Sequence, residues 1–95
     1  MTGSGSERVA REVVCHGLVQ GVGFRFACRE QARAAGVDGW VTNAADGTVR
    51  ARVEGSSRAV AAMLDWLRSG PPHADVEHLD VDDVAPDGRP GFRVR

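Results

Sequence analysis

Residues 17–30, with the sequence GLVQGVGFRFACRE, decide how this chain can fold, because they join a strand-like segment to a helix-like one. Gly21 and Gly23 flank a single valine at this junction. Glycine destabilises the interior of a regular element by roughly 0.5–1 kcal/mol relative to alanine. A pair of glycines here therefore indicates unusual backbone dihedrals or a close approach to another group.

The segments on either side of the junction have opposite periodicities. We expect a strand over residues 8–18, in which Val9, Val13 and Cys15 alternate with polar positions. After the glycines, apolar residues recur at helical spacing as far as Gly36, a residue type that suits the left-handed end of a helix. The chain therefore begins with a strand, a tight loop and a helix.

A hairpin and a second helix follow. Residues 40–42 and 48–54 predict two strands, and residues 43–47 contain an Asp-Gly pair that is typical of a hairpin turn. Ser56 or Ser57 can cap the next helix, which has an apolar stripe and ends before a Gly-Pro-Pro segment.

The remaining residues complete the fold class. Residues 76–84 predict a fourth strand with a bulge, and residues 91–95 predict a short fifth strand. The order strand, helix, strand, strand, helix, strand matches the split βαβ pattern of ferredoxin-like folds. We therefore predict an α+β fold, a ferredoxin-like βαββαβ sandwich with two helices on one face of an antiparallel sheet. In such a sheet, the loop after the first strand and the hairpin after the second open on neighbouring edges.

Length and composition fit one domain. The 95 residues are 42% hydrophobic, which allows a single modest core, and we place this domain at residues 8–95. Residues 1–7 are rich in glycine and serine and are predicted to be a disordered leader. The net charge of −1 gives no reason to expect nucleic acid or an anionic membrane as a partner. No segment has the roughly 20 apolar residues of a membrane span, and the first residues lack the apolar core of a secretory signal. We expect a cytoplasmic monomer.

The cysteines and histidines suggest neither a disulfide framework nor a metal site. Cys15 and Cys28 are not spaced as Cys-x-x-Cys, which suits a reducing compartment. His16, His73 and His78 show no metal-ligand spacing with a cysteine or carboxylate. We therefore expect no metal and no cofactor.

The glycine loop has two interpretations. A strand-to-helix loop directs main-chain N–H groups outward, and the helix dipole adds about half a positive charge, so the junction attracts anions. Arg25, in the first helical turn, can hold two phosphate oxygens with its planar fork. The alternative is a simple tight turn followed by a solvated arginine, and spacing alone does not separate the two.

Other phosphate chemistries fit the sequence less well. The loop lacks the third glycine of a dinucleotide fingerprint, and no Gly-Lys-Ser/Thr follows it. A thiol-based phosphatase needs its cysteine and arginine within one loop, whereas Cys15 lies ten residues before Arg25. Cys15 and His16 also point to opposite faces of a strand, which makes them a poor nucleophile and base pair.

Three separate blocks carry a resemblance to a known family. They are GLVQGVGFR at residues 17–25, GWVTN at residues 39–43 followed by DGTV at residues 46–49, and GPP at residues 70–72. In this order they resemble the signature blocks of the acylphosphatase family, from about Arg8 to the C-terminus.

The resemblance implies a small metal-free hydrolase that cleaves acyl phosphates to a carboxylate and inorganic phosphate. Arg25 matches the phosphate-binding arginine of the family, and Asn43 matches the asparagine that orients the attacking water. The expected phosphate cradle is the backbone of Gln20, Gly21, Val22, Gly23 and Phe24. The only partner implied is a small-molecule acyl phosphate.

Two binding functions compete with this assignment. Ferredoxin-like sheets also bind RNA through exposed strand aromatics, but this chain has no tyrosine and no aromatic residue in the segments 8–18 and 48–54. The second rival is a phosphate-sensing or carbamoyl-phosphate-sensing domain, like the acylphosphatase-type modules of larger maturation enzymes. The absence of an attached domain in this sequence favours a free enzyme.

Overall fold

The computed structural model describes residues 7–95, so most of the predicted leader, residues 1–6, lies outside the described residues. The elements are β1 (Arg8–Leu18), α1 (Phe24–Ala35), β2 (Asp38–Asn43), β3 (Val49–Ser56), α2 (Ser57–Ser69), β4 (Asp75–Val84) and β5 (Phe92–Val94). This order, with the topology described next, confirms the predicted ferredoxin-like α+β fold.

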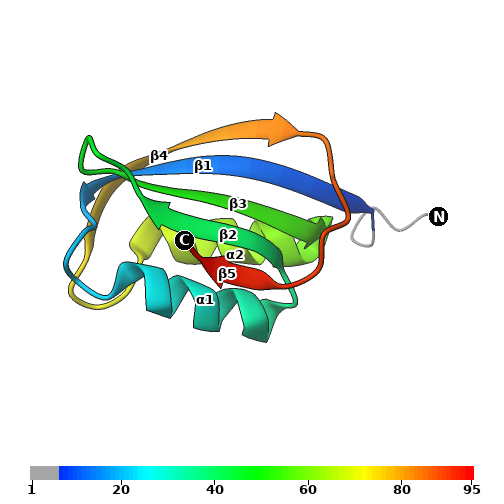
Figure 1. The fold of residues 1–95 in the computed structure, drawn as a ribbon, viewed down its shortest axis with the longest axis horizontal. Helices are drawn as coiled ribbons and strands as arrows, with labels where there is room; N and C mark the ends of the chain where they lie inside the picture. Colours follow the sequence, from blue (N-terminus) through cyan, green and yellow to red (C-terminus); the bar gives the residue numbers. More distant parts are fainter. Residues whose placement is uncertain (1–6) are drawn as a thin grey trace.

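The strands form one sheet in the order β4-β1-β3-β2-β5. The pairs among β1 to β4 are antiparallel, as predicted, but β5 pairs with β2 in parallel. The sheet is therefore mixed, and the expectation of a wholly antiparallel sheet is wrong for its last strand. The physical reason is the β4–β5 connection, which crosses from one edge of the sheet to the other before the chain pairs again (Figure 1).

Both helices pack on the same face of this sheet (Figure 1). The buried residues of α1 are Phe24, Cys28 and Ala32, which repeat every four positions and so form one stripe. The buried residues of α2 are Val60, Met63 and Leu67, which are spaced by three and then four positions and also form one stripe. These stripes meet the inward-facing side chains of the strands in a single core. The opposite face of the sheet carries no helix, and we call it the open face.

The two helices begin differently. The α2 helix starts after Ser56, whose Oγ accepts a hydrogen bond from the N–H of Ala59 at 3.1 Å, as its serine suggested. The α1 helix starts after Gly23 and has no side-chain cap, and it ends at Gly36 in the left-handed conformation. The start of α1 therefore keeps main-chain donors that its own side chains do not satisfy.

Pairing with neighbouring strands extends β2 and β3 beyond their sequence pattern. The strand predicted at residues 40–42 begins at Asp38, because Asp38 pairs with Glu54. The strand predicted at residues 48–54 runs to Ser56, which pairs with Arg8. The predicted bulge lies in the β1–β4 pair, where the register shifts between His16 and Gly17.

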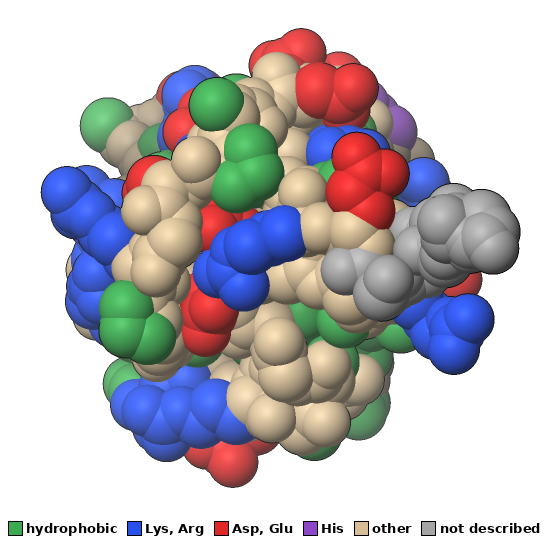
Figure 2. All heavy atoms as spheres, turned by 90° about the vertical axis from the view of Figure 1, so that its right-hand side faces the viewer, with side chains coloured by type: hydrophobic (Ala, Val, Ile, Leu, Met, Phe, Trp, Pro, Cys, Tyr) green, Lys and Arg blue, Asp and Glu red, His purple; other side chains and the backbone are tan. Residues whose placement is uncertain are grey.

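Charged side chains of both signs are interspersed at one end of the molecule (Figure 2). Figure 2 shows the end of the molecule opposite the glycine loop, where arginine and acidic side chains neighbour one another and hydrophobic side chains are scattered. This mixture agrees with a net charge of −1. Within residues 7–95, no helix has the length and apolar character needed to cross a membrane.

Candidate active site

The loop between β1 and α1 owes its shape to two left-handed glycines. Gly21 has φ 76° and Gly23 has φ 75°, a region that residues with a side chain rarely adopt. A Cβ atom built at either position would meet no protein atom within 4 Å. Backbone conformation, not packing against the protein, therefore requires glycine here, and the space beside the loop stays open.

The main-chain donors of this loop have no acceptor within the described part of the chain. Among residues 7–95, the first hydrogen bond from this region is donated by the N–H of Ala27 to the carbonyl of Gly23 at 3.1 Å, and none comes from the N–H groups of residues 20–26. Main-chain N–H groups are strong donors that folded proteins rarely leave unpaired. With the positive end of the α1 dipole, they form a favourable environment for an anion.

Arg25 and Asn43 line one small hollow at this junction. Its volume is about 130 Å³, and Gly21, Gly23 and Phe24 contribute to its wall. Within residues 7–95, the guanidinium of Arg25 has no hydrogen bond or ion pair, and its Cζ lies 5.9 Å from the centroid of the Phe26 ring. A cation without an internal partner, beside free N–H groups, provides further attraction for an anion.

The side chain of Gln20 ties the glycine loop to the hairpin that carries Asn43. Its Nε2 donates to the carbonyl oxygen of Ala44 at 2.7 Å and to that of Thr48 at 2.9 Å. Asn43 is the last residue of β2, directly before this turn. The two halves of the hollow, far apart in sequence, are therefore joined by direct hydrogen bonds.

The turn itself is held by Asp46. Its Oδ1 accepts from the hydroxyl of Thr48 at 2.6 Å and from the N–H of Thr48 at 3.1 Å. These hydrogen bonds, with a smaller contribution from Arg50, lower the pKa of Asp46 below its ordinary value. Asp46 thus shapes the hairpin, as expected, and does not line the hollow.

The hollow also contains residues that the sequence did not indicate. Val19 is buried, and Phe26 is 55% exposed although it is a large apolar side chain. Phe26 was missed because a phenylalanine in a predicted helix suggests core. The available signal was its position two residues from Phe24, which places it off the buried stripe of α1. Gln20 and Val22, both predicted at the site for their backbone groups, are not among the residues that line the hollow.

Two of the three histidines have a carboxylate neighbour in space, contrary to the expectation from their spacing, whereas the expectation of no bound metal stays a prediction. His16 and His78 face each other across β1 and β4, with stacked rings whose centroids are 4.1 Å apart. Nε2 of His16 lies 2.8 Å from Oδ2 of Asp80, and one ligand atom from each of the three residues lies within 4.8 Å of the others, a set able to hold a metal ion. The pairing of β1 with β4 brings His16 next to His78 and Asp80, although Asp80 lies 64 residues further along the chain. The cluster lies on the open face, whereas Arg25 is on a helix that covers the other face.

The cysteines do not supply a nucleophile. Cys15 and Cys28 are fully buried, and burial raises the pKa of each thiol to about 12. Thiolates are the reactive form, so both groups are inert at neutral pH. Cys15 also points into the core while its neighbour His16 is on the open face, as alternation along the strand predicted.

The strand order and helix placement define a ferredoxin-like domain with an anion-attracting junction, and comparison with known proteins identifies its family. The family model of acylphosphatase matches residues 11–94. An acylphosphatase of Thermococcus kodakarensis is 44% identical over 88 residues, which cover 93% of this chain and 97% of that protein. The chain therefore belongs to the acylphosphatase family.

Solved structures agree with this assignment. The structure of an acylphosphatase from Coxiella burnetii matches with a TM-score of 0.89 and 32% identity, over 93% of each chain. The crystal structure of full-length HypF in the phosphate- and nucleotide-bound form matches with a TM-score of 0.87 and 26% identity, over 95% of this chain and 12% of that one. The fold thus occurs both alone and within a much longer protein.

Proposed function

We propose that this chain hydrolyses the carboxyl-phosphate bond of acyl phosphates to give a carboxylate and inorganic phosphate. The observation that carries the proposal is the convergence of Arg25 and Asn43 on one hollow beside the glycine loop. Among residues 7–95, the N–H groups of that loop have no acceptor. A cation and free donors on one side, and an amide on the other, suit a phosphoryl group and an attacking water.

The phosphoryl group is held by the loop and by Arg25. The N–H groups of residues 20–24 donate to its oxygens, and the guanidinium fork adds two parallel hydrogen bonds. Phosphoryl transfer passes through a loose transition state whose negative charge is spread over the equatorial oxygens. Donors that are already oriented stabilise this charge without reorganising, which is where the catalytic effect arises.

Asn43 orients the water. Its side-chain oxygen accepts one hydrogen of the water and fixes the line of attack on phosphorus. An amide is not a base, so the proton passes to a phosphate oxygen of the substrate. Gln20 is a positioning residue for this step. Its hydrogen bonds to Ala44 and Thr48 hold the hairpin that carries Asn43 in place relative to the loop.

The leaving group explains why no general acid is needed. A carboxylate leaves as the conjugate base of an acid with a pKa of about 4, so it needs no proton at neutral pH. The chain's own donors supply the electrostatic support, and we therefore propose a reaction without metal or cofactor. The acyl part of the substrate lies against Phe26, which lines the hollow and is 55% exposed. We also propose that the protein acts as a cytoplasmic monomer.

The test is hydrolysis of benzoyl phosphate by the purified chain, with phosphate release as the readout and p-nitrophenyl phosphate as a phosphomonoester control. We expect turnover of the acyl phosphate, and a far slower reaction with the monoester, because p-nitrophenolate is a more basic and therefore poorer leaving group than a carboxylate. Arg25→Ala should abolish turnover, while Arg33→Ala, an exposed position on the same helix, should keep it. Equal loss in both variants, or no turnover in the wild type, would overturn the proposal.

A phosphate-sensing role is the second candidate, and the match to HypF favours it. That protein is much longer, and its crystal structure is of a phosphate- and nucleotide-bound form. A sensor would bind phosphate at the same loop but release no product. Calorimetric binding of phosphate together with absent hydrolysis of benzoyl phosphate would favour this second function over the first.

A further inference from the structure

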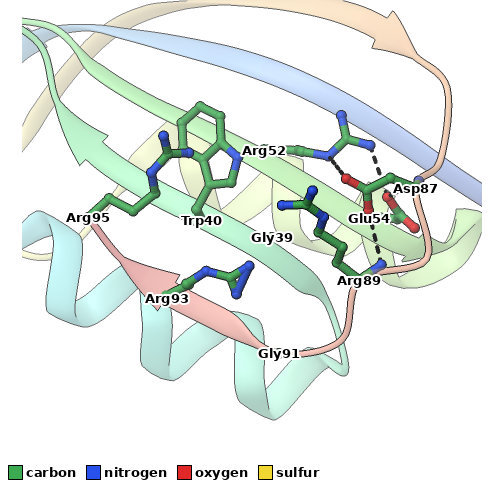
Figure 3. Close-up of a pocket in the computed structure, with 9 residues that line it drawn as sticks. All are labelled: Gly39, Trp40, Arg52, Glu54, Asp87, Arg89, Gly91, Arg93 and Arg95. Atoms are coloured by element: carbon green, nitrogen blue, oxygen red, sulfur yellow. Dashed lines mark hydrogen bonds and ion pairs between the residues drawn. The ribbon is translucent and has the colours of Figure 1, made fainter.

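A second, larger hollow lies on the open face of the sheet. Its volume is about 300 Å³, and its charged lining consists of Arg52, Arg89, Arg93 and Arg95 with Glu54 and Asp87. It shares no lining residue with the hollow of Arg25 and Asn43. Figure 3 shows the guanidinium groups of Arg89 and Arg93 turned toward the space beside Gly39.

Strand register brings these side chains together. Trp40 on β2 pairs with Arg52 on β3 and with Arg93 on β5, so the three residues form a row across the sheet. Arg95 follows on the same face, and its Cζ lies 4.4 Å from the centroid of the Trp40 ring (Figure 3). Arg89 comes from the connection between β4 and β5. The cluster is therefore a product of the fold, not of sequence proximity.

One of the arginines is already neutralised. Arg52 donates from Nη2 to Glu54 at 3.0 Å and to the carbonyl of Ala85 at 2.7 Å. Its Nε lies 3.6 Å from Asp87, and its Nη1 lies 3.7 Å from Glu12, which is outside the hollow. Arg52 therefore lines the hollow in a fixed position, and its charge is already balanced by neighbouring carboxylates.

The two carboxylates contact groups other than the guanidiniums of Arg89 and Arg93. Glu54 is 1% exposed and accepts from Arg8, from Arg52 and from the N–H groups of Asp87 and Gly88. Asp87 faces Arg52. Within residues 7–95, the guanidinium groups of Arg89 and Arg93 have no hydrogen bond or ion pair. Four arginines against two carboxylates leave an excess of two positive charges in the lining.

We propose that this hollow binds a diphosphate group, either as free pyrophosphate or as the diphosphate of a nucleotide, with Arg89 and Arg93 as its main contacts. Guanidinium groups bind phosphate through paired hydrogen bonds, and two of them without partners match a multiply charged anion. A volume of about 300 Å³ equals that of about ten liquid water molecules, at about 30 Å³ each, and has room for more than one phosphate. Trp40 forms one wall beside the anion.

The experiment uses the full chain carrying Arg25→Ala, so that phosphate bound at the candidate active site does not contribute and failure of the proposed hydrolysis leaves the result interpretable. Pyrophosphate and ADP are titrated separately by calorimetry and by NMR of the two tryptophan indole N–H signals. We expect saturable binding of both probes and a shift of the Trp40 signal, with the Trp66 signal unchanged. Binding of pyrophosphate alone would identify the free anion as the ligand, and tighter binding of ADP would identify a nucleotide.

Substitutions assign the binding to this hollow. Arg89→Gln and Arg93→Gln should each raise the dissociation constant about tenfold, the effect expected for loss of one charge-assisted contact. Arg58→Gln, an exposed arginine on α2, is the matched control and should leave it unchanged. Absence of binding, a shift confined to Trp66, or equal weakening by all three substitutions would overturn the proposal.

Discussion

The side-chain amide of Gln20, on the loop that begins α1, donates to the main-chain carbonyl of Ala44 on the β2–β3 hairpin at 2.7 Å. This hydrogen bond joins the loop that would bind phosphate to the strand end that carries Asn43. Both carbonyls bound by Gln20 have a second donor, since Gly47 donates to Ala44 and the N–H of Ala44 donates to Thr48. The hairpin can therefore form without Gln20, but its position relative to the loop depends on this side chain.

Replacing Gln20 by methionine tests that positioning role. Gln20→Met keeps the length of the side chain but removes its donors, so we expect a stability loss of only about 1 kcal/mol. The turnover number for benzoyl phosphate should fall about tenfold or more with little change in KM, because a misplaced water affects the transition state and not substrate binding. Urea denaturation and steady-state kinetics measure the two effects. A rise in KM at unchanged turnover would contradict the positioning role.

Replacing Arg25 by lysine separates charge from geometry. An ammonium keeps the positive charge but cannot form two parallel hydrogen bonds to a phosphoryl group. We expect kcat/KM for benzoyl phosphate to fall about 100-fold or more, the range found when one transition-state donor is lost. Arg33→Lys on the exposed side of α1 should remain at the wild-type value. Near-wild-type turnover in Arg25→Lys would show that the fork is not required.

Truncating Asn43 tests the proposed orientation of water. Asn43 is exposed at the end of β2, so Asn43→Ala should leave the free energy of unfolding nearly unchanged. We expect kcat to fall about tenfold or more while KM changes little, since the water is aligned mainly in the transition state. The same kinetic assay distinguishes the alternative: a raised KM with normal kcat would make Asn43 a substrate-binding residue.

Most of the fold could be predicted because its signals are local. The α1 stripe, the Ser56 cap, the Asp-Gly turn and Gly36 each specify an element through nearby residues. The parallel pairing of β5 with β2 could not be predicted, because only three residues pair and their direction depends on how the preceding connection crosses the sheet.

The candidate site likewise has features that the local sequence indicates and contacts that only the folded sheet creates. The loop glycines and Arg25 are adjacent in sequence, so their chemistry was visible, and the link to Asn43 came from a family resemblance. The contact between Gln20 and Ala44, the row of Arg52, Trp40 and Arg93, and the pair of His16 and His78 all depend on strand register. A spacing rule along the chain does not detect such contacts.

Metal removal should leave hydrolysis unaffected. The leaving carboxylate needs no Lewis acid, and the histidine and aspartate cluster lies on the open face, away from the helix that carries Arg25. We expect equal turnover of benzoyl phosphate before and after prolonged treatment with EDTA, and equal turnover in His78→Ala and His73→Ala. Activity lost in the chelator and restored by Zn²⁺ would instead assign the metal a role in the reaction.

Acid should destabilise the fold through Glu54. Burial by itself raises the pKa of this carboxyl, but the N–H groups of Asp87 and Gly88, with Arg8 and Arg52, outweigh burial and lower the pKa to about 2. The ordinary value of 4.5 applies in the unfolded chain, which therefore binds the proton more readily than the folded protein does. The stabilisation by Glu54 is complete above about pH 4.5 and is lost as the pH falls toward about 2.

Glu54→Gln tests this dependence, because it removes the charge while keeping the shape. Breaking a buried ion pair destabilises a protein by about 3 kcal/mol, so we expect a loss of this size at pH 7. The difference between wild type and variant should shrink between pH 4.5 and pH 2, as the wild-type carboxyl becomes protonated. Urea denaturation at a series of pH values measures it, and Glu30→Gln, at a side chain 70% exposed, is the matched control. A stability difference that stays constant down to pH 2 would show that the charge of Glu54 does not stabilise the fold.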